Sequence, residues 1–256
     1  MSNEELQPGV AWIVGGGSGI GASVATLLAE RGWTVAISGR RADKLTAVAS
    51  ANTSKILPYA LDVTDSAAVD EAVAAIARDL GRIDLFIFGA AAWQPMAVGD
   101  YAFDKFARVV DTNYLGVIRI ANPLLAQMDK QGGGHFAVIA SVAGYFGLPR
   151  SAAYSSTKAA LINLLETMRT ELAPRNIKVR MIAPGFVKSE LTDKNDFPMP
   201  FLMETDAAAR RIVDGLTKSD RFEIAFPRRM VWLMKSVRWL PYPVFFWVTS
   251  KMLPKQ

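Results

Sequence analysis

Three residues in the second half of the chain have the types and spacing of a proton-transfer site. Tyr154 and Lys158 lie four residues apart in a stretch with helical periodicity, so they share one face of the predicted helix. An ammonium group near a phenol favours the phenolate and lowers the phenol pKa from its ordinary value of about 10. Ser141 follows an apolar run and can donate a hydrogen bond to an oxygen on which negative charge develops. The pattern predicts that Tyr154 is the general acid or base of a reaction at a carbonyl or an alcohol. The alternative is that Tyr154 and Lys158 are an ordinary helix pair and Ser141 is a turn residue.

A glycine-rich stretch, VGGGSGIGAS, lies near the start of the chain between an apolar run and a helical pattern. In such a turn Gly15 can form the tight bend, Gly19 can let the backbone approach a phosphate, and Gly21 can let the helix pack close to the strand. A helix that begins at Ile20 offers free N–H groups to a pyrophosphate. The stretch predicts a dinucleotide site that includes Gly17 and Ser18, whereas the alternative interpretation is a flexible loop.

The end of the next apolar run indicates which dinucleotide binds. An acidic residue there would bind the ribose 2′-hydroxyl of NAD, but this chain has Arg40 and Arg41 instead. Guanidinium groups match a 2′-phosphate in charge and geometry, so we expect NADP(H). The alternative is that both arginines are ordinary surface charges at the start of a helix.

Short apolar runs alternate with periodic stretches along most of the chain. The predicted strands are Val10–Val14, Trp33–Ile37, Ile56–Leu61, Asp84–Phe88, Phe136–Ala140, Ile177–Ile182 and Phe222–Phe226. The predicted helices are the stretch from Ile20 to Gly32, Asp43–Ala51, Ser66–Leu80, Phe103–Met128 and Ala153–Ala173. This alternation predicts an α/β doubly wound fold of the Rossmann type, with a seven-stranded, mostly parallel sheet covered by helices on both faces. Pro58 places the third strand at a sheet edge.

Composition excludes several classes of protein. The 256 residues are 51% hydrophobic, which favours a folded core, and they include no cysteine, which excludes disulfides and zinc–cysteine sites. We predict no metal site. Residues 1–8 are polar and acidic and lack the features of a secretory signal, so we expect a cytoplasmic protein.

The positive charge of the chain is concentrated at its end. Residues 227–256 contain six cationic residues and no acidic one, which leaves 29 − 6 = 23 cations against 24 anions, a net charge of −1, in residues 1–226. A body without a net basic charge argues against nucleic-acid binding. The window Met230–Val248 contains two prolines and two cations, which argues against a transmembrane span.

The same segment is rich in aromatic residues, and we expect residues 228–253 to meet a membrane interface. Two alternatives stay open, since the segment could instead pack over the substrate cleft or against a second subunit. Upstream, Lys188–Arg210 is rich in Phe, Met and Leu. Contact of the tail with a membrane would favour a hydrophobic, lipid-like substrate.

Taken together, these motifs resemble those of the short-chain dehydrogenase/reductase (SDR) family, of the short single-domain branch, from about Val10 to Thr192. The glycines at 15, 19 and 21 fit the family's TGxxxGIG pattern, and Tyr154 with Lys158 fits its YxxxK motif. The resemblance implies a catalytic set and further cofactor contacts. The catalytic set is Asn113, Ser141, Tyr154 and Lys158, and the further contacts are Asp62, Val63, Ala90, Pro184, Gly185 and Val187.

The resemblance also implies roles for these residues. Lys158 would hold the nicotinamide ribose, Asn113 would order a water in a relay to Lys158, and Lys188–Arg210 would form a mobile substrate lid. The family is commonly dimeric or tetrameric, which implies a homo-oligomer.

Two positions depart from the family pattern. Val14 replaces a threonine, and Phe88-Gly89-Ala90-Ala91 replaces an Asn-Asn-Ala-Gly segment. The lost asparagine hydrogen bond implies altered local packing rather than lost catalysis. The only histidine, His135, lies at the start of a strand, opposite the catalytic end, where we expect a structural role.

We therefore predict a Rossmann-fold catalytic domain over residues 1–226, with a basic aromatic extension over 227–256. The leading hypothesis is an NADP-dependent oxidoreductase that transfers a hydride between nicotinamide and a hydrophobic carbonyl or alcohol. The alternative is a non-catalytic dinucleotide-binding protein anchored through its tail.

Overall fold

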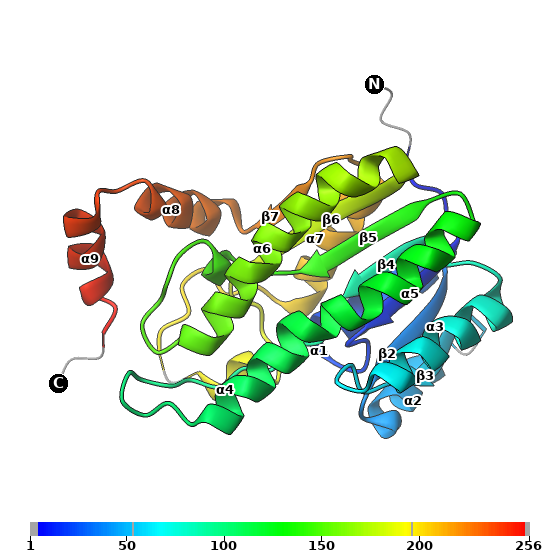
Figure 1. Ribbon diagram of the computed structural model, residues 1–256, viewed down its shortest axis with the longest axis horizontal. Helices are drawn as coiled ribbons and strands as arrows, with labels where there is room; N and C mark the ends of the chain where they lie inside the picture. Colours follow the sequence, from blue (N-terminus) through cyan, green and yellow to red (C-terminus); the bar gives the residue numbers. More distant parts are fainter. Residues whose placement is uncertain (1–4, 53, 196, 254–256) are drawn as a thin grey trace.

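The computed structural model describes residues 5–52, 54–195 and 197–253, and within these ranges seven strands form one sheet (Figure 1). Every neighbouring pair of strands is parallel, in the order β3-β2-β1-β4-β5-β6-β7. The strands are β1 (Val10–Val14), β2 (Thr34–Gly39), β3 (Ile56–Ala60), β4 (Leu85–Phe88), β5 (Gly134–Ile139), β6 (Ile177–Pro184) and β7 (Glu223–Phe226). The predicted doubly wound fold is confirmed, and β3, which contains Pro58, is an edge strand as predicted.

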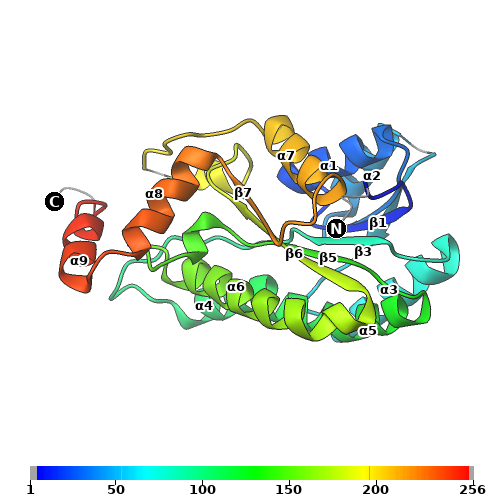
Figure 2. The same cartoon turned by 90° about the horizontal axis from the view of Figure 1, so that it is seen from above.

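Helices cover both faces of the sheet, as Figure 2 shows edge-on. One face carries α1 (Gly19–Glu30), α2 (Ala42–Ser50) and α7 (Thr205–Thr217). The other carries α3 (Ser66–Leu80), α5 (Gly116–Lys130) and α6 (Ala152–Leu172). Because both faces are covered, the strands are buried apolar runs rather than alternating ones.

Alternate side chains of each strand enter the two halves of the core. Trp12, Phe86 and Phe136 extend from neighbouring strands into the α3–α5–α6 side and pack with tilted rings, whose centroids are 5.0 Å apart in each consecutive pair. Ile13 and Ile87 point to the α1–α2–α7 side. Burying a side chain of this size stabilises the fold by about 1.5–3 kcal/mol.

The order of the strands creates a crevice at one end of the sheet, where the carboxyl ends of the strands lie. From β1 the chain winds outward through β2 to β3, then returns to β4 on the other side of β1. At such a reversal the crossovers leave in opposite directions, and an opening forms at the carboxyl ends of β1 and β4.

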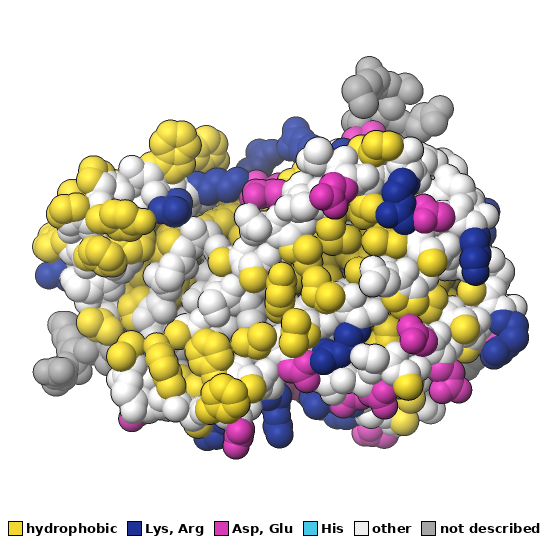
Figure 3. All heavy atoms as spheres, in the orientation of Figure 1, with side chains coloured by type: hydrophobic (Ala, Val, Ile, Leu, Met, Phe, Trp, Pro, Cys, Tyr) yellow, Lys and Arg dark blue, Asp and Glu magenta, His cyan; other side chains and the backbone are white. Residues whose placement is uncertain are grey.

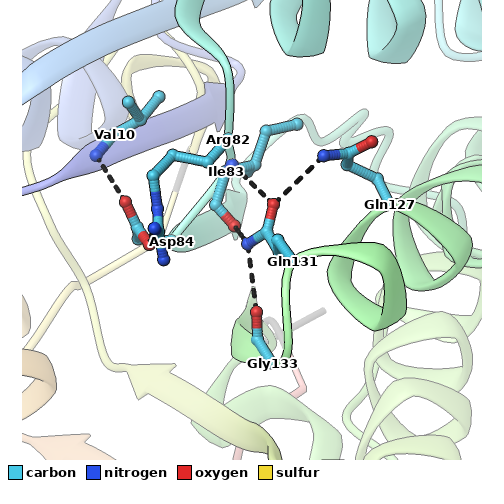
Figure 4. A network of polar contacts seen from close by, with 7 residues as sticks. All are labelled: Val10, Arg82, Ile83, Asp84, Gln127, Gln131 and Gly133. Atoms are coloured by element: carbon cyan, nitrogen blue, oxygen red, sulfur yellow. Dashed lines mark hydrogen bonds and ion pairs between the residues drawn. The ribbon is translucent and has the colours of Figure 1, made fainter.

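At the opposite end of the sheet, a network of polar contacts holds the amino ends of the strands together (Figure 4). The Gln131 side chain donates to the Ile83 and Gly133 carbonyls at 2.7 and 3.0 Å, and it accepts from the Ile83 amide at 3.1 Å. Asp84 accepts from the Val10 amide at 2.9 Å. These contacts fix the amino ends of β1, β4 and β5 relative to one another.

His135 lies at this amino end of the sheet, near the start of β5, as expected from the sequence. It is buried, and burial lowers its pKa to about 4, so it is neutral near pH 7.

The predicted continuous helix Phe103–Met128 is wrong in one respect. The structure divides it into α4 (Phe103–Val110), one π-helical turn η1 (Asp111–Leu115) and α5. Arg119 braces the turn, with its guanidinium 2.6 Å from a carboxylate oxygen of Asp111. A single π turn hardly changes the spacing of apolar residues, so the sequence pattern does not reveal it.

After β7 the chain forms two helices that the sequence analysis did not assign, α8 (Arg228–Arg238) and α9 (Tyr242–Ser250). Both views place them beyond the carboxyl ends of the strands (Figures 1 and 2). Short 3₁₀ turns complete the elements: η2 (Val142–Gly144), η3 (Ala173–Arg175) and η4 (Thr192–Lys194).

Candidate active site

The turn between β1 and α1 is shaped by close backbone approach. Gly15 has φ of 87°, and a Cβ there would lie 2.7 Å from the Ala90 amide nitrogen. A Cβ on Gly21 would lie 2.2 Å from the Gly15 carbonyl oxygen. No other residue fits these positions without moving the backbone, which explains the glycines at 15 and 21.

The first turn of α1 leaves hydrogen-bond donors available. Ser18 is the N-cap residue, but its side chain does not cap the helix. Instead its hydroxyl accepts a hydrogen bond from Arg41 at 3.1 Å. The exposed N–H groups and the positive end of the helix dipole suit a phosphate group.

This turn forms one wall of a cleft of about 670 Å³ at the carboxyl ends of the strands. Every site residue predicted from the sequence lines the cleft except Asn113. The lining residues that were predicted are Gly15, Gly17, Ser18, Gly19, Ile20, Gly21, Arg40, Arg41, Asp62, Val63, Ala90, Ser141, Tyr154, Lys158, Pro184, Gly185 and Val187.

The fold brings Ser141, Tyr154 and Lys158 together at the inner end of this cleft. Ser141 follows β5 directly, whereas Tyr154 and Lys158 lie on successive turns of α6. The Lys158 ammonium lies 5.5 Å from the centre of the Tyr154 ring and donates to the Ile139 carbonyl at 2.7 Å. Ser141 hydrogen-bonds with Tyr154 and also donates to the Pro184 carbonyl at 3.3 Å.

The pKa values of this pair differ from the sequence-based expectation. Burial raises the pKa of Tyr154 to about 12, although the hydrogen bond with Ser141 acts in the opposite direction. Burial also lowers the pKa of Lys158 to about 7. Lys158 therefore does not lower the Tyr154 pKa in this structure, because desolvation destabilises the charged forms of both groups.

Asn113 lies behind the cleft rather than on its surface. The π turn η1 directs its side chain to the loop after β4, where it accepts from the Ala92 amide at 2.6 Å and donates to the Ala92 carbonyl at 3.0 Å. It also donates to the Thr157 hydroxyl at 3.3 Å. Asn113 thus holds the loop after β4 against α6.

Cationic and acidic side chains meet at the outer end of the cleft. Arg41 pairs with Glu190 at 2.8 Å, and Lys44 lies 3.8 Å from the same carboxylate. Across the cleft, burial opposes ionisation of Asp62, but hydrogen bonds from Thr64 and the nearby Arg40 charge hold its pKa below the ordinary value. Asp62 is therefore an acceptor at neutral pH.

Several lining residues were not predicted from the sequence. Thr112, Ser189 and Glu190 line the cleft, as does Lys44, which extends the pair of arginines by one helical turn and could have been found by that spacing. Trp93 packs edge-on against Tyr154, with ring centroids 5.2 Å apart. It lies in a loop without periodicity, so no sequence signal indicates it.

The loop after β6 closes one side of the cleft. The predicted lid Lys188–Arg210 is too long, because its last six residues belong to α7, which begins at Thr205. The Trp93 indole donates to Asn195 of this loop at 2.9 Å, and Phe197 packs against Phe186 with ring centroids 6.0 Å apart.

The two departures from the family pattern are accommodated by packing. Val14 and Phe88 are fully buried in the same cluster, and the Gly89 amide donates to the Val14 carbonyl at 2.7 Å. Backbone and apolar contacts thus join β1 to the end of β4.

The described part of the chain also bears on metal binding and on membrane spans. No group of three His, Cys, Asp or Glu residues lies together there in a way that could hold a metal ion. Nor does that part contain a helix with the length and apolar character needed to cross a bilayer.

Comparison with known proteins shows to which family the chain is similar. The sequence model of the short chain dehydrogenase family matches residues 9–198. An uncharacterized oxidoreductase of Myxococcus xanthus is 35% identical over 94% of this chain and 96% of its own. One of Staphylococcus haemolyticus is 34% identical over 84% of this chain and 93% of its own.

Solved structures share the fold. A short-chain dehydrogenase from Streptomyces avermitilis superposes with a TM-score of 0.81 at 25% identity, covering 90% of this chain and 92% of its own. One from Mycobacterium marinum superposes with a TM-score of 0.78 at 28% identity, covering 86% and 93%. The chain therefore belongs to the short-chain dehydrogenase/reductase family of nicotinamide-dependent oxidoreductases.

Proposed function

We propose that this protein is an NADP(H)-dependent oxidoreductase that reduces a hydrophobic carbonyl, or oxidises the corresponding alcohol, with Tyr154 as the general acid or base. The observation that carries the proposal is the convergence of Ser141, Tyr154 and Lys158 in the cleft that also contains the glycine turn. A protein that only bound a dinucleotide would have no need for this convergence.

The residues present fit an NADP(H) molecule. The uncapped first turn of α1 suits the pyrophosphate, and Asp62 is an ionised acceptor that suits the adenine amino group. Arg40, Arg41 and Lys44 lie where the end of β2 meets α2, and the residues directly after β2 are Arg40 and Arg41 rather than an acid. This cationic cluster suits a 2′-phosphate better than a ribose hydroxyl.

The protein residues handle the proton and the developing charge. Burial keeps Tyr154 protonated at neutral pH, so in the reductive direction it donates its phenolic proton to the carbonyl oxygen. Ser141 donates a hydrogen bond to the same oxygen as its charge grows. In the oxidative direction Tyr154 accepts the proton. When bound, the cofactor supplies or accepts the hydride.

Lys158 has a separate role in the proposal. Its position one turn after Tyr154 suits a hydrogen bond to the nicotinamide ribose, and a pKa of about 7 lets it exchange a proton near neutrality. Asn113 positions the loop after β4, with the water relay implied by family resemblance as its further role.

A hydrophobic substrate is supported by Trp93, which packs edge-on against Tyr154, and by the loop between β6 and α7. The first part of that loop lines the cleft, and its later part exposes Phe197, Phe201 and Leu202. These apolar surfaces have no charge to recognise a polar substrate.

We further propose that residues 1–226 form the catalytic domain of a cytoplasmic homodimer or homotetramer, and that residues 228–253 face a membrane. The apolar side chains of Val98, Phe103, Leu115 and Ile118 are exposed around α4 and α5, which supports self-association of the catalytic domain.

The test is oxidation of NADPH and of NADH by the purified protein with aldehydes and ketones of increasing chain length. We expect turnover with NADPH to exceed that with NADH and to rise with chain length. Tight NADPH binding without turnover of any carbonyl or alcohol would contradict the proposal and favour a binding protein.

A further inference from the structure

The outer surface of α8 and α9 exposes an unusual set of aromatic side chains. Trp232, Trp239 and Trp247 are 74%, 88% and 63% exposed, and Tyr242 and Phe246 are exposed beside them. We call this set, with Leu233 and Val244, the tail surface. Figure 3 shows hydrophobic side chains gathered over α8 and α9 at this end of the molecule. Contiguous exposed apolar surface of this kind marks an interaction site.

Buried contacts on the inner faces of α8 and α9 hold the tail surface against the body of the protein. The inner face of α8 buries Met230, Met234 and Val237 at helical spacing, and α9 buries Phe245. Phe245 packs edge-on against Phe146, with ring centroids 5.4 Å apart. These inner residues occupy one face of each helix, whereas Trp232, Trp239 and Trp247 on the other face stay largely exposed, and Tyr242 and Phe246 stack on each other at the surface.

A polar contact also fixes α8 to the body. Glu223 of β7 accepts from the Tyr145 hydroxyl at 2.6 Å and pairs with Lys235 of α8. The Lys235 ammonium lies 5.4 Å from the centre of the Tyr145 ring. Lys235 is thus paired within the fold, whereas the other described cations of the tail are exposed.

Those exposed cations give the tail surface a positive charge. Arg228, Arg229, Arg238 and Lys251 are exposed, and residues 227–256 contain no acidic residue. Lys251 lies 5.5 Å from the centre of the Trp247 ring. The surface therefore combines indole rings with positive charge.

We infer that the tail surface docks on a lipid bilayer that contains anionic headgroups. Tryptophan and tyrosine favour the boundary between headgroups and acyl chains, and lysine and arginine are attracted to anionic lipid phosphates. A second copy of the chain is a poorer partner, because a symmetric contact would bring two sets of cations together without an acid to neutralise them.

The helices that carry the tail surface pack close to the cleft, so docking also determines where the cleft lies relative to the bilayer. Met230 packs against Gly185, where a Cβ would lie 2.6 Å from the Met230 sulfur, and Val142 of the turn after Ser141 lies in the same cluster. Phe186 also belongs to that cluster and contacts Phe197 of the loop over the cleft. Docking would therefore bring the mouth of the cleft to the bilayer. This part rests on the proposed function, since it gives a membrane-dissolved carbonyl a direct route to Tyr154.

The test is sedimentation of the full chain with vesicles of phosphatidylcholine alone, or with part of it replaced by phosphatidylglycerol. We expect binding to the anionic vesicles, weakened by salt, with a blue shift of tryptophan emission. The combined change of Trp232, Trp239 and Trp247 to Ser should reduce the affinity by about tenfold or more. The matched control is Tyr101→Ser, which alters an exposed aromatic residue outside the tail surface and should leave binding unchanged.

A second variant tests the charge. Replacing Arg228, Arg229 and Arg238 by Gln should weaken binding to anionic vesicles by about tenfold or more, whereas the same change at Arg210 and Arg211 of α7 should not. Equal binding to both kinds of vesicle, or none by the folded wild-type chain, would overturn the inference. A fall in oligomeric mass in the tryptophan variant, without any vesicle binding by the wild type, would assign the surface to a second copy.

These binding measurements need neither cofactor nor substrate. Their failure would leave the proposed reductase activity standing, and loss of that activity would leave vesicle binding unaffected.

Discussion

Burial moves the pKa values of Lys158 and Tyr154 in opposite directions, and both shifts disfavour charge. Lys158 is neutral in half of the folded molecules at a pH of about 7, whereas in the unfolded chain its pKa is 10.5. A buried ammonium in this position therefore lowers the stability of the fold. Such a cost is expected at a functional site, where residues are placed for chemistry rather than for stability.

This cost predicts a pH-dependent effect of Lys158→Met. Below a pH of about 7, lysine is charged in both states and the full desolvation cost applies. As pH rises toward 10.5, the folded state has already lost the proton that the unfolded state still binds, so wild-type stability increases. The variant should be more stable than wild type by about 2–4 kcal/mol near pH 7, and this gap should shrink toward pH 10.

Urea unfolding of both proteins at the two pH values measures the gap. The lost hydrogen bond to Ile139 and the titration of Tyr154 do not mimic the result, because the first does not depend on pH and the second occurs in both proteins. A gap that stays constant or widens with pH would contradict the burial argument.

Glu190 is predicted to oppose NADPH binding. Its carboxylate pairs with Arg41 and Lys44, the cations that we assign to the 2′-phosphate. Exposed ion pairs contribute about 0.2–1 kcal/mol, so Glu190→Gln should tighten NADPH binding about two- to fivefold. The affinity for NADH should not change, and Glu204→Gln, which alters a second acid of the same loop, serves as the control. Equal tightening for both cofactors would contradict this competition.

Sequence reasoning found the residues of the site that belong to spaced motifs. Tyr154 and Lys158 were recognised by their separation of one helical turn, and Gly15 and Gly21 by their place between a strand and a helix. Trp93 and Glu190 were missed because they lie in loops, where position depends on tertiary contacts rather than on spacing.

At the scale of elements, the site depends on how closely α6 packs against η2, since α6 carries Tyr154 and η2 directly follows Ser141. Gly144 of η2 makes this approach possible. A Cβ there would lie 2.7 Å from the carbonyl carbon of Lys158, which is backbone and cannot rotate away.

Gly144→Ala should therefore push α6 from η2. We expect a loss of about 1–3 kcal/mol in the free energy of unfolding and a marked fall in turnover, because overpacking shifts the backbone that carries the site. Gly147→Ala is the matched control, since nothing lies within 4 Å of a Cβ at that position. It should change stability by less than about 0.5 kcal/mol. Similar effects of the two substitutions, measured by denaturant unfolding and by turnover, would refute the packing argument.

The elements were predictable where apolar runs or helical periodicity dominate. The seven strands were found from their apolar runs, and most boundaries moved by only one or two residues. The π turn at Asp111–Leu115 was not found, because it depends on the hydrogen bonds of Asn113 to Ala92, which are distant in sequence. The helices α8 and α9 were described only as an amphipathic segment, since their mixture of cations, prolines and aromatic residues also fits a membrane-surface peptide.

At the scale of the whole molecule, the tail is both part of the fold and a separate surface. Its inner residues cover the turns that follow Ser141 and Pro184, while its outer residues face away from the body. The two faces of α8 should therefore respond differently to substitution.

Met234→Ala and Trp239→Ala test this difference. Met234 is buried, so its truncation should lower the free energy of unfolding by about 2 kcal/mol or more. Trp239 is exposed, so its truncation should change stability by less than about 0.5 kcal/mol. Thermal unfolding at equal protein concentration would compare them. A large loss from Trp239→Ala would show that this side chain is buried in solution, as in a subunit contact.

Proton transfer by Tyr154 in an NADPH-dependent carbonyl reduction is the step on which the proposed function depends. Its most direct test is the rate of NADPH oxidation by Tyr154→Phe, compared with wild type and with Tyr59→Phe, an edge-strand tyrosine outside the cleft. We predict that Tyr154→Phe loses turnover by about a hundredfold or more while its NADPH affinity stays within about threefold of wild type, and that Tyr59→Phe is active. Turnover by Tyr154→Phe close to that of wild type would contradict the mechanism.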